Sequence, residues 1–277
     1  MTHDDISKTP DSPLASIYSN GTYFSDASRH SEDAEFKAGN FLSLLTAWVE
    51  EEKIEIRSIV DVGCGTGDVL KTIVENLQKK NLPIDWAKGY DVSPHVVNIV
   101  KGEIEFVHAD FSTSPEFADL VTLFDVIEHV PNPIDYLKEV AKRCKYVGLN
   151  IPLDNSLNVA LRNMFHSKIH NPGHIIFLDI VGALNTLAFS GLRVICYKYS
   201  FGFMASSARR SRMARIAFPF RYFLSLLNPW LLSKSFGGAS LLVIAATPIG
   251  TGETVVSLPS SIPTRKVARS LNALIHE

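Results

Sequence analysis

The sequence predicts an α/β protein with a seven-stranded, mostly parallel sheet that carries helices on both faces. Two observations indicate this class. Apolar strand-like runs alternate with amphipathic segments through most of the chain, and a glycine-rich loop follows the first run directly. Strands that alternate with helices are joined by right-handed crossovers, which make neighbouring strands parallel and cover both faces of the sheet.

The expected elements follow in a regular order. A first amphipathic helix is indicated from Glu35, because apolar residues between Phe36 and Val49 recur at intervals of three or four. Short apolar runs then predict strands at 58–62, 86–91, 104–109, 120–124, 145–151, 192–199 and 240–246. The segments between them are expected to form helices at 68–79, 94–101, 133–143, 155–165 and 178–189.

Composition and charge exclude several classes of protein. With 277 residues, 46% of them apolar, the chain can bury a sizeable core and is neither a collagen, a coiled coil nor a wholly disordered chain. The net charge of −2 argues against a general nucleic-acid binder. Cys64, Cys144 and Cys196 form no CxxC pair, so we expect a reducing, cytoplasmic setting. We expect neither a signal peptide nor a membrane span.

Changes in composition along the chain divide it into three parts. We expect a flexible leader over 1–25, one domain over 26–250, and a C-terminal tail over 251–277 to which no role is assigned. Within the domain, a basic amphipathic insertion at 203–236 separates the last two strands.

The glycine loop is the most informative segment. Gly63, Gly65 and Gly67 follow a buried strand and precede a helix, so backbone can approach a ligand at the carboxyl edge of the sheet. A dinucleotide-binding loop would have a third glycine where Asp68 stands. Because Asp61 and Asp68 flank the place where phosphates would lie, the ligand should be cationic. S-adenosylmethionine carries a sulfonium and an ammonium group, and it fits this requirement.

Further acids follow the next two strands. An acid at the end of the second strand, Asp91 beside Val92, can accept hydrogen bonds from both ribose hydroxyls. Asp110 and Phe111 end the third strand and are placed for an adenine amine and an adenine ring face. We expect Asp61 and the loop residues Gly63, Cys64, Gly65 and Gly67 to hold the methionine end, with Cys64 acting as a packing residue.

These segments resemble the class I S-adenosylmethionine-dependent methyltransferases over about residues 29–247. V-D-V-G-C-G-T-G at 60–67 and G-Y-D-V-S-P at 89–94 match the cofactor motifs of that family. The segments 29–38, 125–130, 151–154, 172–174 and 237–241 look like a bacterial subgroup associated with cell-surface polysaccharide or secondary-metabolite pathways. The resemblance implies a Rossmann-like sheet with an antiparallel last strand, and a cofactor site that includes Asp125.

The acceptor side is expected after the fourth strand. Asp125, Glu128 and His129 are spaced i, i+3 and i+4, so on a helical turn they would share one face. Downstream, the segment 165–174 adds three histidines, His166, His170 and His174, in what is expected to be a loop. Methyl transfer to a hydroxyl needs positioning and proton removal, and histidine suits the second task.

Three interpretations of these residues stay open. In the first, His129 or His174 is a general base. In the second, Asp125, Glu128, His129 and His174 bind a divalent ion such as Mg or Zn, as similarity to the ubiquinone-pathway O-methyltransferases and the small-RNA 2'-O-methyltransferases implies; Asp125 departs from their pattern, which has Glu. In the third, Glu128 and His129 only shape the cofactor pocket, and His166 and His170 lie in solvent.

Residues ahead of the expected first helix allow two interpretations. His30, Asp33 and Lys37 could close over the cofactor as a helical lid, as the resemblance suggests, or simply cap and solvate the helix.

The insertion at 203–236 lies in a strongly basic region. From Ile180 to Gly252 there is no acidic residue and there are eight lysines and arginines. Between 213 and 232, Arg215 and Arg221 are interleaved with aromatic and aliphatic residues. Such a segment could cover the sheet or form a dimer face, act as a lid over an anionic or sugar-linked acceptor, or contact the inner face of a membrane peripherally.

The sequence therefore predicts methyl transfer from S-adenosylmethionine to a hydroxyl of a small or sugar-like acceptor, with no specific nucleic-acid partner. Glu128, His129 and His174 are the expected catalytic residues. The alternatives are N- or C-methylation, and a membrane-associated cofactor-binding subunit without catalysis. The oligomeric state is left open.

Overall fold

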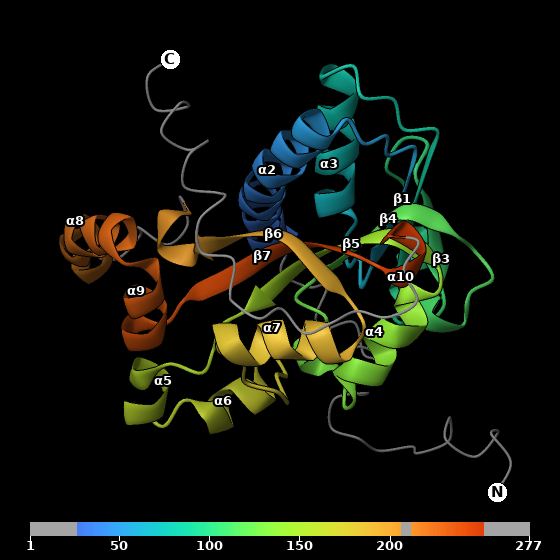
Figure 1. Cartoon of the computed structure of the whole chain (residues 1–277). Helices are drawn as coiled ribbons and strands as arrows, with labels where there is room; N and C mark the ends of the chain where they lie inside the picture. Colours follow the sequence, from blue (N-terminus) through green and yellow to red (C-terminus); the bar gives the residue numbers. More distant parts are fainter. Residues whose placement is uncertain (1–26, 206–211, 252–277) are drawn as a thin grey trace, which may run out of the picture.

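A seven-stranded sheet forms the centre of the molecule. The computed structural model describes residues 27–205 and 212–251, with the side chains of 27–32 and 213 excepted, so the expected leader and tail lie outside it. The strands lie in the order β3-β2-β1-β4-β5-β7-β6. The first five strands pair in parallel, whereas β7 runs antiparallel to both β5 and β6 (Figure 1). The predicted fold class and the antiparallel last strand are confirmed.

The strands are β1 (Ser58–Val62), β2 (Trp86–Asp91), β3 (Glu105–His108), β4 (Ala118–Phe124), β5 (Cys144–Pro152), β6 (Arg193–Phe201) and β7 (Ala239–Ala246). The α-helices are α2 (Ala27–Glu52), α3 (Asp68–Lys79), α4 (Pro133–Ala141), α5 (Leu157–Leu161), α6 (Phe165–His170), α7 (Ile180–Phe189), α8 (Arg212–Leu227), α9 (Pro229–Phe236) and α10 (Pro248–Thr251). Single 3₁₀ turns are η3 (Pro94–Asn98), η4 (Phe111–Thr113), η5 (Ile127–His129) and η6 (Gly202–Met204).

Three expected elements differ from the structure. The first helix begins at Ala27, so Asp33 and Lys37 lie within it and not ahead of it. The helix expected over 94–101 is only the turn η3, whose β-branched valines disfavour a longer helix. The helix expected over 155–165 is divided into α5 and α6, because Asn163 between them has a φ of 51°, a left-handed conformation that ends a helix.

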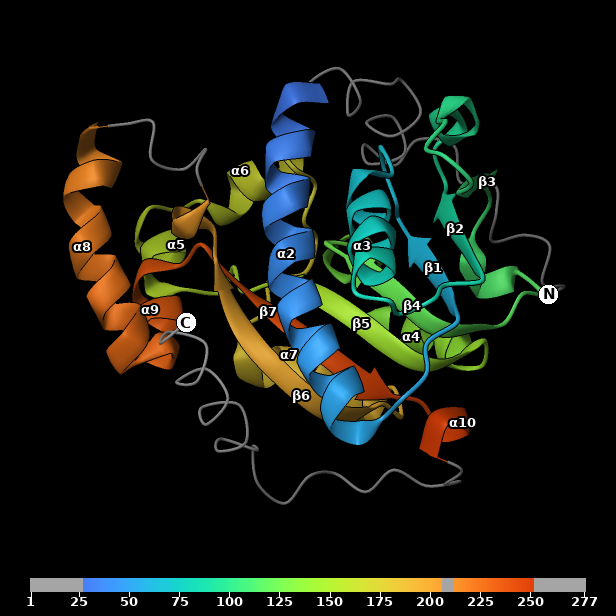
Figure 2. The same ribbon diagram turned by 90° about the horizontal axis from the view of Figure 1, so that it is seen from above.

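Helices cover both faces of the sheet, which gives two apolar layers. On one face α2 and α3 pack through Phe41, Leu45 and Ile73. On the other face lie α4 and α7 (Figures 1 and 2). The closest approach of α2 is at Gly148 in β5, where an added Cβ would lie 2.4 Å from the Phe41 ring. Because a glycine stands there, α2 lies directly on the sheet.

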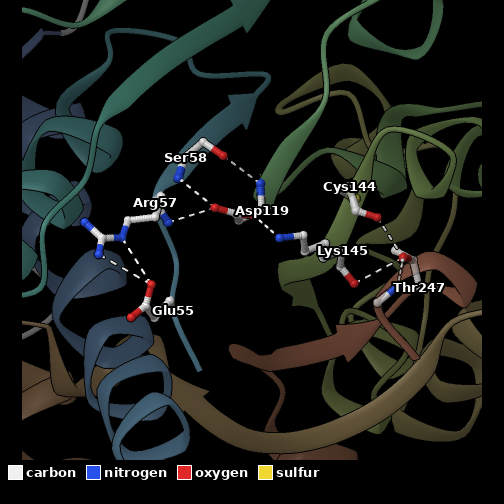
Figure 3. A network of polar contacts seen from close by, with 8 residues as sticks. Glu55, Arg57, Ser58, Asp119, Cys144, Lys145 and Thr247 are labelled. Atoms are coloured by element: carbon white, nitrogen blue, oxygen red, sulfur yellow. Dashed lines mark hydrogen bonds and ion pairs between the residues drawn. The ribbon is translucent and has the colours of Figure 1, made fainter. Parts of the chain in front are cut away.

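A polar clamp holds the edge of the sheet at which the parallel strands begin (Figure 3). The Asp119 carboxylate accepts hydrogen bonds from the backbone N–H of Arg57 at 2.8 Å and of Ser58 at 3.2 Å, and pairs with Lys145 at 2.7 Å. Thr247 donates to the Cys144 carbonyl at 2.7 Å. At this edge the Asp119 carboxylate joins β1, β4 and β5, and the Thr247 hydroxyl joins the segment after β7 to β5.

The opposite edge is where a ligand can bind. The chain passes from β1 outward to β2 and β3, and then returns to β4 on the other side of β1. The loops after β1 and β4 therefore diverge, which opens a crevice at the carboxyl ends of these two strands. The insertion contributes η6, α8 and α9 between β6 and β7.

Candidate functional site

The glycine loop between β1 and α3 adopts a conformation that favours glycine. Gly63, Gly65 and Gly67 have φ values of 69°, 51° and 74°. Space is also restricted, since a Cβ on Gly63 would lie 2.7 Å from Val126 and one on Gly67 would lie 2.5 Å from the Phe106 ring. A side chain at Gly63 or Gly67 would thus collide with neighbouring side chains, so glycine keeps the loop closely packed below the crevice.

Asp61 lies beneath this loop as a buried carboxylate. It is 3% exposed, and its Oδ1 accepts a hydrogen bond of 2.6 Å from the Thr122 hydroxyl. Burial raises the pKa of Asp61 to about 7, with a smaller contribution from the Asp91 charge, and the Thr122 hydrogen bond opposes the shift. A cationic ammonium group beside this carboxylate would stabilise its ionised form.

Asp91 at the end of β2 organises the loop. Its Oδ2 accepts from the Gly65 N–H at 2.9 Å and its Oδ1 from the Ser93 N–H at 2.8 Å. Each carboxylate oxygen has a second lone pair, which leaves capacity for ribose hydroxyls. Val92 beside it is 62% exposed and offers an apolar surface to a base.

The residues expected around the adenine differ in their availability. Asp110 is exposed, and its Oδ1 accepts from the Ser112 N–H at 2.8 Å. Phe111, by contrast, is fully buried against Tyr90, with ring centroids 5.1 Å apart. The expected adenine contact through the Phe111 ring face is therefore wrong, because the ring fills the core under the site.

Cys64 behaves as a packing residue. It is buried, and burial followed by the nearby charges of Asp61 and Asp91 raises the pKa of its thiol well above the ordinary value. A thiol in this state is a poor nucleophile. Burial likewise raises the pKa of Cys144 and of Cys196.

A cavity of about 90 Å³ lies over the loop and is closed on one side by α2. Its lining residues are Asp33, Ala34, Lys37, Asp61, Gly63, Cys64, Gly65, Thr66, Asp68, Val69, Phe124 and Asp125. The presence of Asp33 and Lys37 favours the lid interpretation of this segment, whereas the His30 side chain lies outside the described residues. A cavity of about 210 Å³ at the other edge of the sheet is lined mainly by apolar side chains of α2, α3 and the residues that follow each helix.

Asp125 faces this cavity and not the histidines. Its Oδ2 pairs with Lys37 at 2.5 Å, and its Oδ1 accepts from the Asn150 side chain at 2.7 Å. The expectation that Asp125, Glu128 and His129 share a helical face is wrong, because Asp125 has a φ of 56° and η5 begins two residues later. Asp125 is consequently not part of the group of side chains that could bind a metal.

The other three candidates do come together. Glu128, His129 and His174 offer side-chain atoms that all lie within 4.8 Å of one another; we call them the imidazole–carboxylate cluster. The Nε2 atoms of His129 and His174 lie 3.9 and 3.7 Å from Oε1 of Glu128. The two rings meet edge to face, with centroids 4.9 Å apart.

Hydrogen bonds fix which nitrogen of each ring is protonated. His129 Nδ1 lies 2.9 Å from the Gly173 carbonyl oxygen, which can only accept, so this nitrogen carries the hydrogen. His174 Nδ1 lies 2.6 Å from Asp154. Burial raises the pKa of Asp154, but hydrogen bonds from His174 and Lys168 outweigh it, so the net shift is downward. The ionised Asp154 accepts from Nδ1, so Nε2 is the nitrogen of each ring whose lone pair is available whenever that ring is neutral.

Glu128 completes the cluster with an uncompensated carboxylate. It is 1% exposed, and neither of its oxygens has a hydrogen-bond partner among the described residues. Burial raises its pKa well above the usual range, and the Asp125 charge adds to this effect. Burial also lowers the pKa of His129. The three side chains of the cluster thus bring electron-pair donors close together, and a proton or a cation between them would stabilise this arrangement.

The remaining histidines lie elsewhere. His166 and His170 lie on the exposed helix α6, not in a loop, with their Nε2 atoms 3.3 Å apart. Sequence reasoning gave no role to Asn150 or Lys168, and it used Asp154 only as part of a motif. Asn150 holds Asp125, and Lys168 pairs with Asp154 at 2.9 Å. Only their position in the sequence could have indicated a role: Asn150 lies near the end of β5, and Asp154 lies two residues after that end.

Comparison with known proteins agrees with this geometry. Residues 30–195 match the family model described as a methyltransferase domain. The mitochondrial ubiquinone biosynthesis O-methyltransferase of Schizosaccharomyces pombe is 29% identical over 100 residues. That match covers 33% of this chain and 35% of the yeast protein, so the chain aligns with about a third of its relative.

Similar folds are found among solved structures. A Haloferax volcanii methyltransferase in complex with the Trm112 activator has a TM-score of 0.55, at 16% identity over 87% of this chain and 100% of that one. The magnesium protoporphyrin IX methyltransferase of Synechocystis with bound S-adenosylhomocysteine has a TM-score of 0.51, at 12% identity over 84% and 97% of the two chains. At such identities the likeness concerns the fold.

The chain belongs to the methyltransferase-domain family, and it is a class I S-adenosylmethionine-dependent methyltransferase. The family and the ligand-bound structures of this fold support S-adenosylmethionine as the cofactor. No helix among the described residues has both the length and the apolar character needed to cross a membrane.

Proposed function

We propose that this methyltransferase transfers the methyl group to a hydroxyl oxygen of a small or sugar-like acceptor. The observation that supports the proposal is the imidazole–carboxylate cluster. An oxygen nucleophile must lose a proton, whereas a neutral amine attacks without losing one first. Two imidazoles with Nε2 lone pairs facing a buried carboxylate provide for that proton loss.

The cofactor half of the proposal uses the loop and the acids around it. Asp61, Gly63, Gly65 and Gly67 hold the methionine end, with Cys64 packed beneath. Asp91 and Val92 hold the ribose and a face of the base. Asp110 accepts from the adenine amine. The Lys37–Asp125 pair closes the methionine end from above, at a point where a carboxylate and an ammonium of the cofactor could both find opposite charges.

The acceptor half uses the cluster as a cation site. Glu128, His129 and His174 fit a divalent ion. The Glu128 carboxylate is buried with no hydrogen-bond partner in the described ranges 27–205 and 212–251, and each imidazole has its Nδ1 held by a hydrogen bond. A divalent ion such as Mg or Zn supplies the positive charge that lowers the pKa of an acceptor hydroxyl. Asp125 is not included in this set.

The chain's own residues then position the reaction. The acceptor hydroxyl loses its proton to solvent, its oxygen attacks the methyl carbon, the carbon–sulfur bond breaks, and sulfur keeps the electron pair as a neutral thioether. Hydrogen bonds to Gly173 and Asp154 hold the two rings in place, so their Nε2 atoms stay fixed beside Glu128. Backbone N–H groups of Ile175 and Ile176 donate to the Glu128 carbonyl at 2.9 and 3.2 Å and anchor the two segments of the cluster together.

The experiment is an acceptor screen with methyl-labelled S-adenosylmethionine. Matched alcohols, phenols and sugar hydroxyls are compared with the corresponding amines, using protein as purified, treated with EDTA, and restored with magnesium or zinc. We expect label on hydroxyl acceptors only, loss of transfer after EDTA, and recovery on adding metal. The S-adenosylhomocysteine affinity, measured on the same samples, should not change with EDTA.

Each other outcome changes one part of the proposal. Hydroxyl methylation that resists EDTA would assign an imidazole Nε2 of His129 or His174 as a metal-free general base. Label on amines but not on alcohols would contradict O-methylation. Tight S-adenosylhomocysteine binding with no transfer to any acceptor would favour a non-catalytic cofactor-binding subunit.

A further inference from the structure

Helix α8 presents its most apolar face outward. Ile216, Phe220, Phe223 and Leu227 follow one another along one side of the helix and are 74%, 60%, 60% and 65% exposed. Leu226 is 63% exposed on the same side, and Trp230 of α9 continues the strip at 50%. We call these six residues the apolar edge. Exposed apolar residues scattered singly are ordinary, but a continuous strip of six large side chains is not.

The inward face of α8 carries both polar and apolar side chains, and Phe218 lies there against Phe203, with ring centroids 5.8 Å apart. Arg221 points inward, where its guanidinium lies 4.7 Å from the Phe203 ring centroid and donates to the Gly237 carbonyl at 3.1 Å. Ser225 is buried on this side, and Leu224 packs against the main core. A helix that only covers the sheet would turn most of its large apolar side chains inward, whereas α8 leaves Ile216, Phe220 and Phe223 outside. Its outward apolar strip therefore indicates a partner.

The position of α8 makes the apolar edge accessible. Two views show α8 at the periphery of the molecule, held to the body through α9 and η6 (Figures 1 and 2). The charge of the surrounding sequence indicates which kind of surface the apolar edge would bind. No acidic residue occurs between Ile180 and Gly252, and that stretch contains eight lysines and arginines. Arg212 and Arg215 are exposed at the N-terminal end of the apolar edge.

We propose that the apolar edge docks on the surface of an anionic phospholipid bilayer, with α8 lying in the plane of the interface. Cationic residues beside exposed Phe, Leu and Trp are the composition that favours such a surface. A second copy of this chain is disfavoured, because the cationic ends of two α8 helices would then lie close together. The bilayer supplies both phosphate charge for Arg212 and Arg215 and an apolar layer for Phe220 and Phe223.

The experiment is co-sedimentation of the full chain with vesicles of phosphatidylcholine alone and of phosphatidylcholine mixed with phosphatidylglycerol. We expect binding to the mixed vesicles, weak binding to the neutral ones, and release by salt. The double variant Phe220→Ser/Phe223→Ser should reduce partitioning by about tenfold or more. Phe189→Ser in α7 is the matched control, since Phe189 is also 60% exposed but lies away from the apolar edge. It should bind as the unmodified protein does.

The same variants test whether the protein still folds and whether a second copy of the chain, and not a bilayer, covers the apolar edge. Circular dichroism and S-adenosylhomocysteine affinity should be unchanged in the double variant, because the apolar edge lies outside the cofactor site. Arg212→Gln/Arg215→Gln, with charge removed and aromatics kept, should also weaken binding to the mixed vesicles. Absence of vesicle binding, or equal binding by the double variant, would overturn the proposal. A lipid-free dimer that the double variant abolishes would assign the apolar edge to a second copy instead.

Discussion

The cofactor loop and the imidazole–carboxylate cluster lie at the same edge of the sheet, yet they are built in opposite ways. In the loop, polar groups are already paired: Asp91 holds two backbone N–H groups, and Asp61 accepts from Thr122. In the cluster, neither oxygen of Glu128 has a hydrogen-bond partner within the part of the chain that the structure describes. The cofactor side is therefore preorganised, whereas the acceptor side has a charge that is balanced only when a proton or cation arrives.

Because of this difference, we expect substitutions in the cofactor loop and in the cluster to impair different steps. The loop is one continuous stretch after β1, supported by the end of β2. The cluster combines the turn after β4 with a segment near residue 174, and Asp154 supports it from behind. A substitution in one side should therefore change cofactor affinity or turnover, but not both.

The largest expected effect is on the acceptor side. His174→Ala should reduce turnover by about a hundredfold or more while the affinity for S-adenosylhomocysteine stays nearly constant, because Nε2 faces Glu128 and not the loop. Steady-state rates and calorimetry on the same preparation measure both. His170→Ala, an exposed histidine of α6, is the matched control and should keep full turnover. Full activity in His174→Ala would end the catalytic assignment.

The next effect is on the cofactor side. Asp91→Ala should weaken cofactor binding by about 1 to 3 kcal/mol through lost hydrogen bonds to the ribose and to the loop N–H groups. At saturating cofactor, turnover should recover. Asp135→Ala is the control, because Asp135 has an exposed carboxylate on α4. Calorimetric titration measures the cofactor affinity of both variants. Unchanged affinity in Asp91→Ala would remove this residue from the site.

A smaller effect tests how the cluster is held. Asp154→Asn should lower turnover by about tenfold, because the amide holds the His174 ring less well than the ionised carboxylate does. The pH profile of turnover should shift as well, which a purely structural role would not cause. Thermal unfolding serves as the control. A loss of turnover that merely follows a loss of folded protein would count against a positioning role for Asp154.

The smallest effect concerns pH. Because burial raises the pKa of Asp61 to about 7, a proton competes with the cofactor ammonium below that pH. Affinity for S-adenosylhomocysteine should therefore fall by about fivefold from pH 7 to pH 6, and protons should be released on binding in that range. Asp61→Asn should bind more weakly and lose this dependence. A flat profile in the unmodified protein would contradict the contact.

The sequence was most informative where structure is local. The succession of strands and helices along the chain, the glycine loop and the acid after β2 follow from contiguous motifs, and the structure agrees with them. Phe111 shows the limit, since alternation at a strand end does not reveal that a ring turns into the core against Tyr90. Asp125 shows another, because its left-handed backbone breaks the helical spacing on which its grouping with Glu128 depended.

Long-range pairing was beyond the sequence. Nothing in the spacing of Asn150, Asp154 and Lys168 predicts that the first holds Asp125 or that the others form a chain behind His174. The insertion is a related case. Its basic and aromatic composition can be read from the sequence, but which face of α8 points outward depends on the contacts that α8 makes with α9 and η6.

The central claim is that the cluster acts on the acceptor and not on the cofactor. Its most direct test is single-turnover methyl transfer at saturating S-adenosylmethionine, comparing the unmodified protein with Glu128→Gln and using the best hydroxyl acceptor from the screen. We predict that Glu128→Gln is slower by about a hundredfold or more although its cofactor site is full. Equal rates for the two proteins would contradict the account.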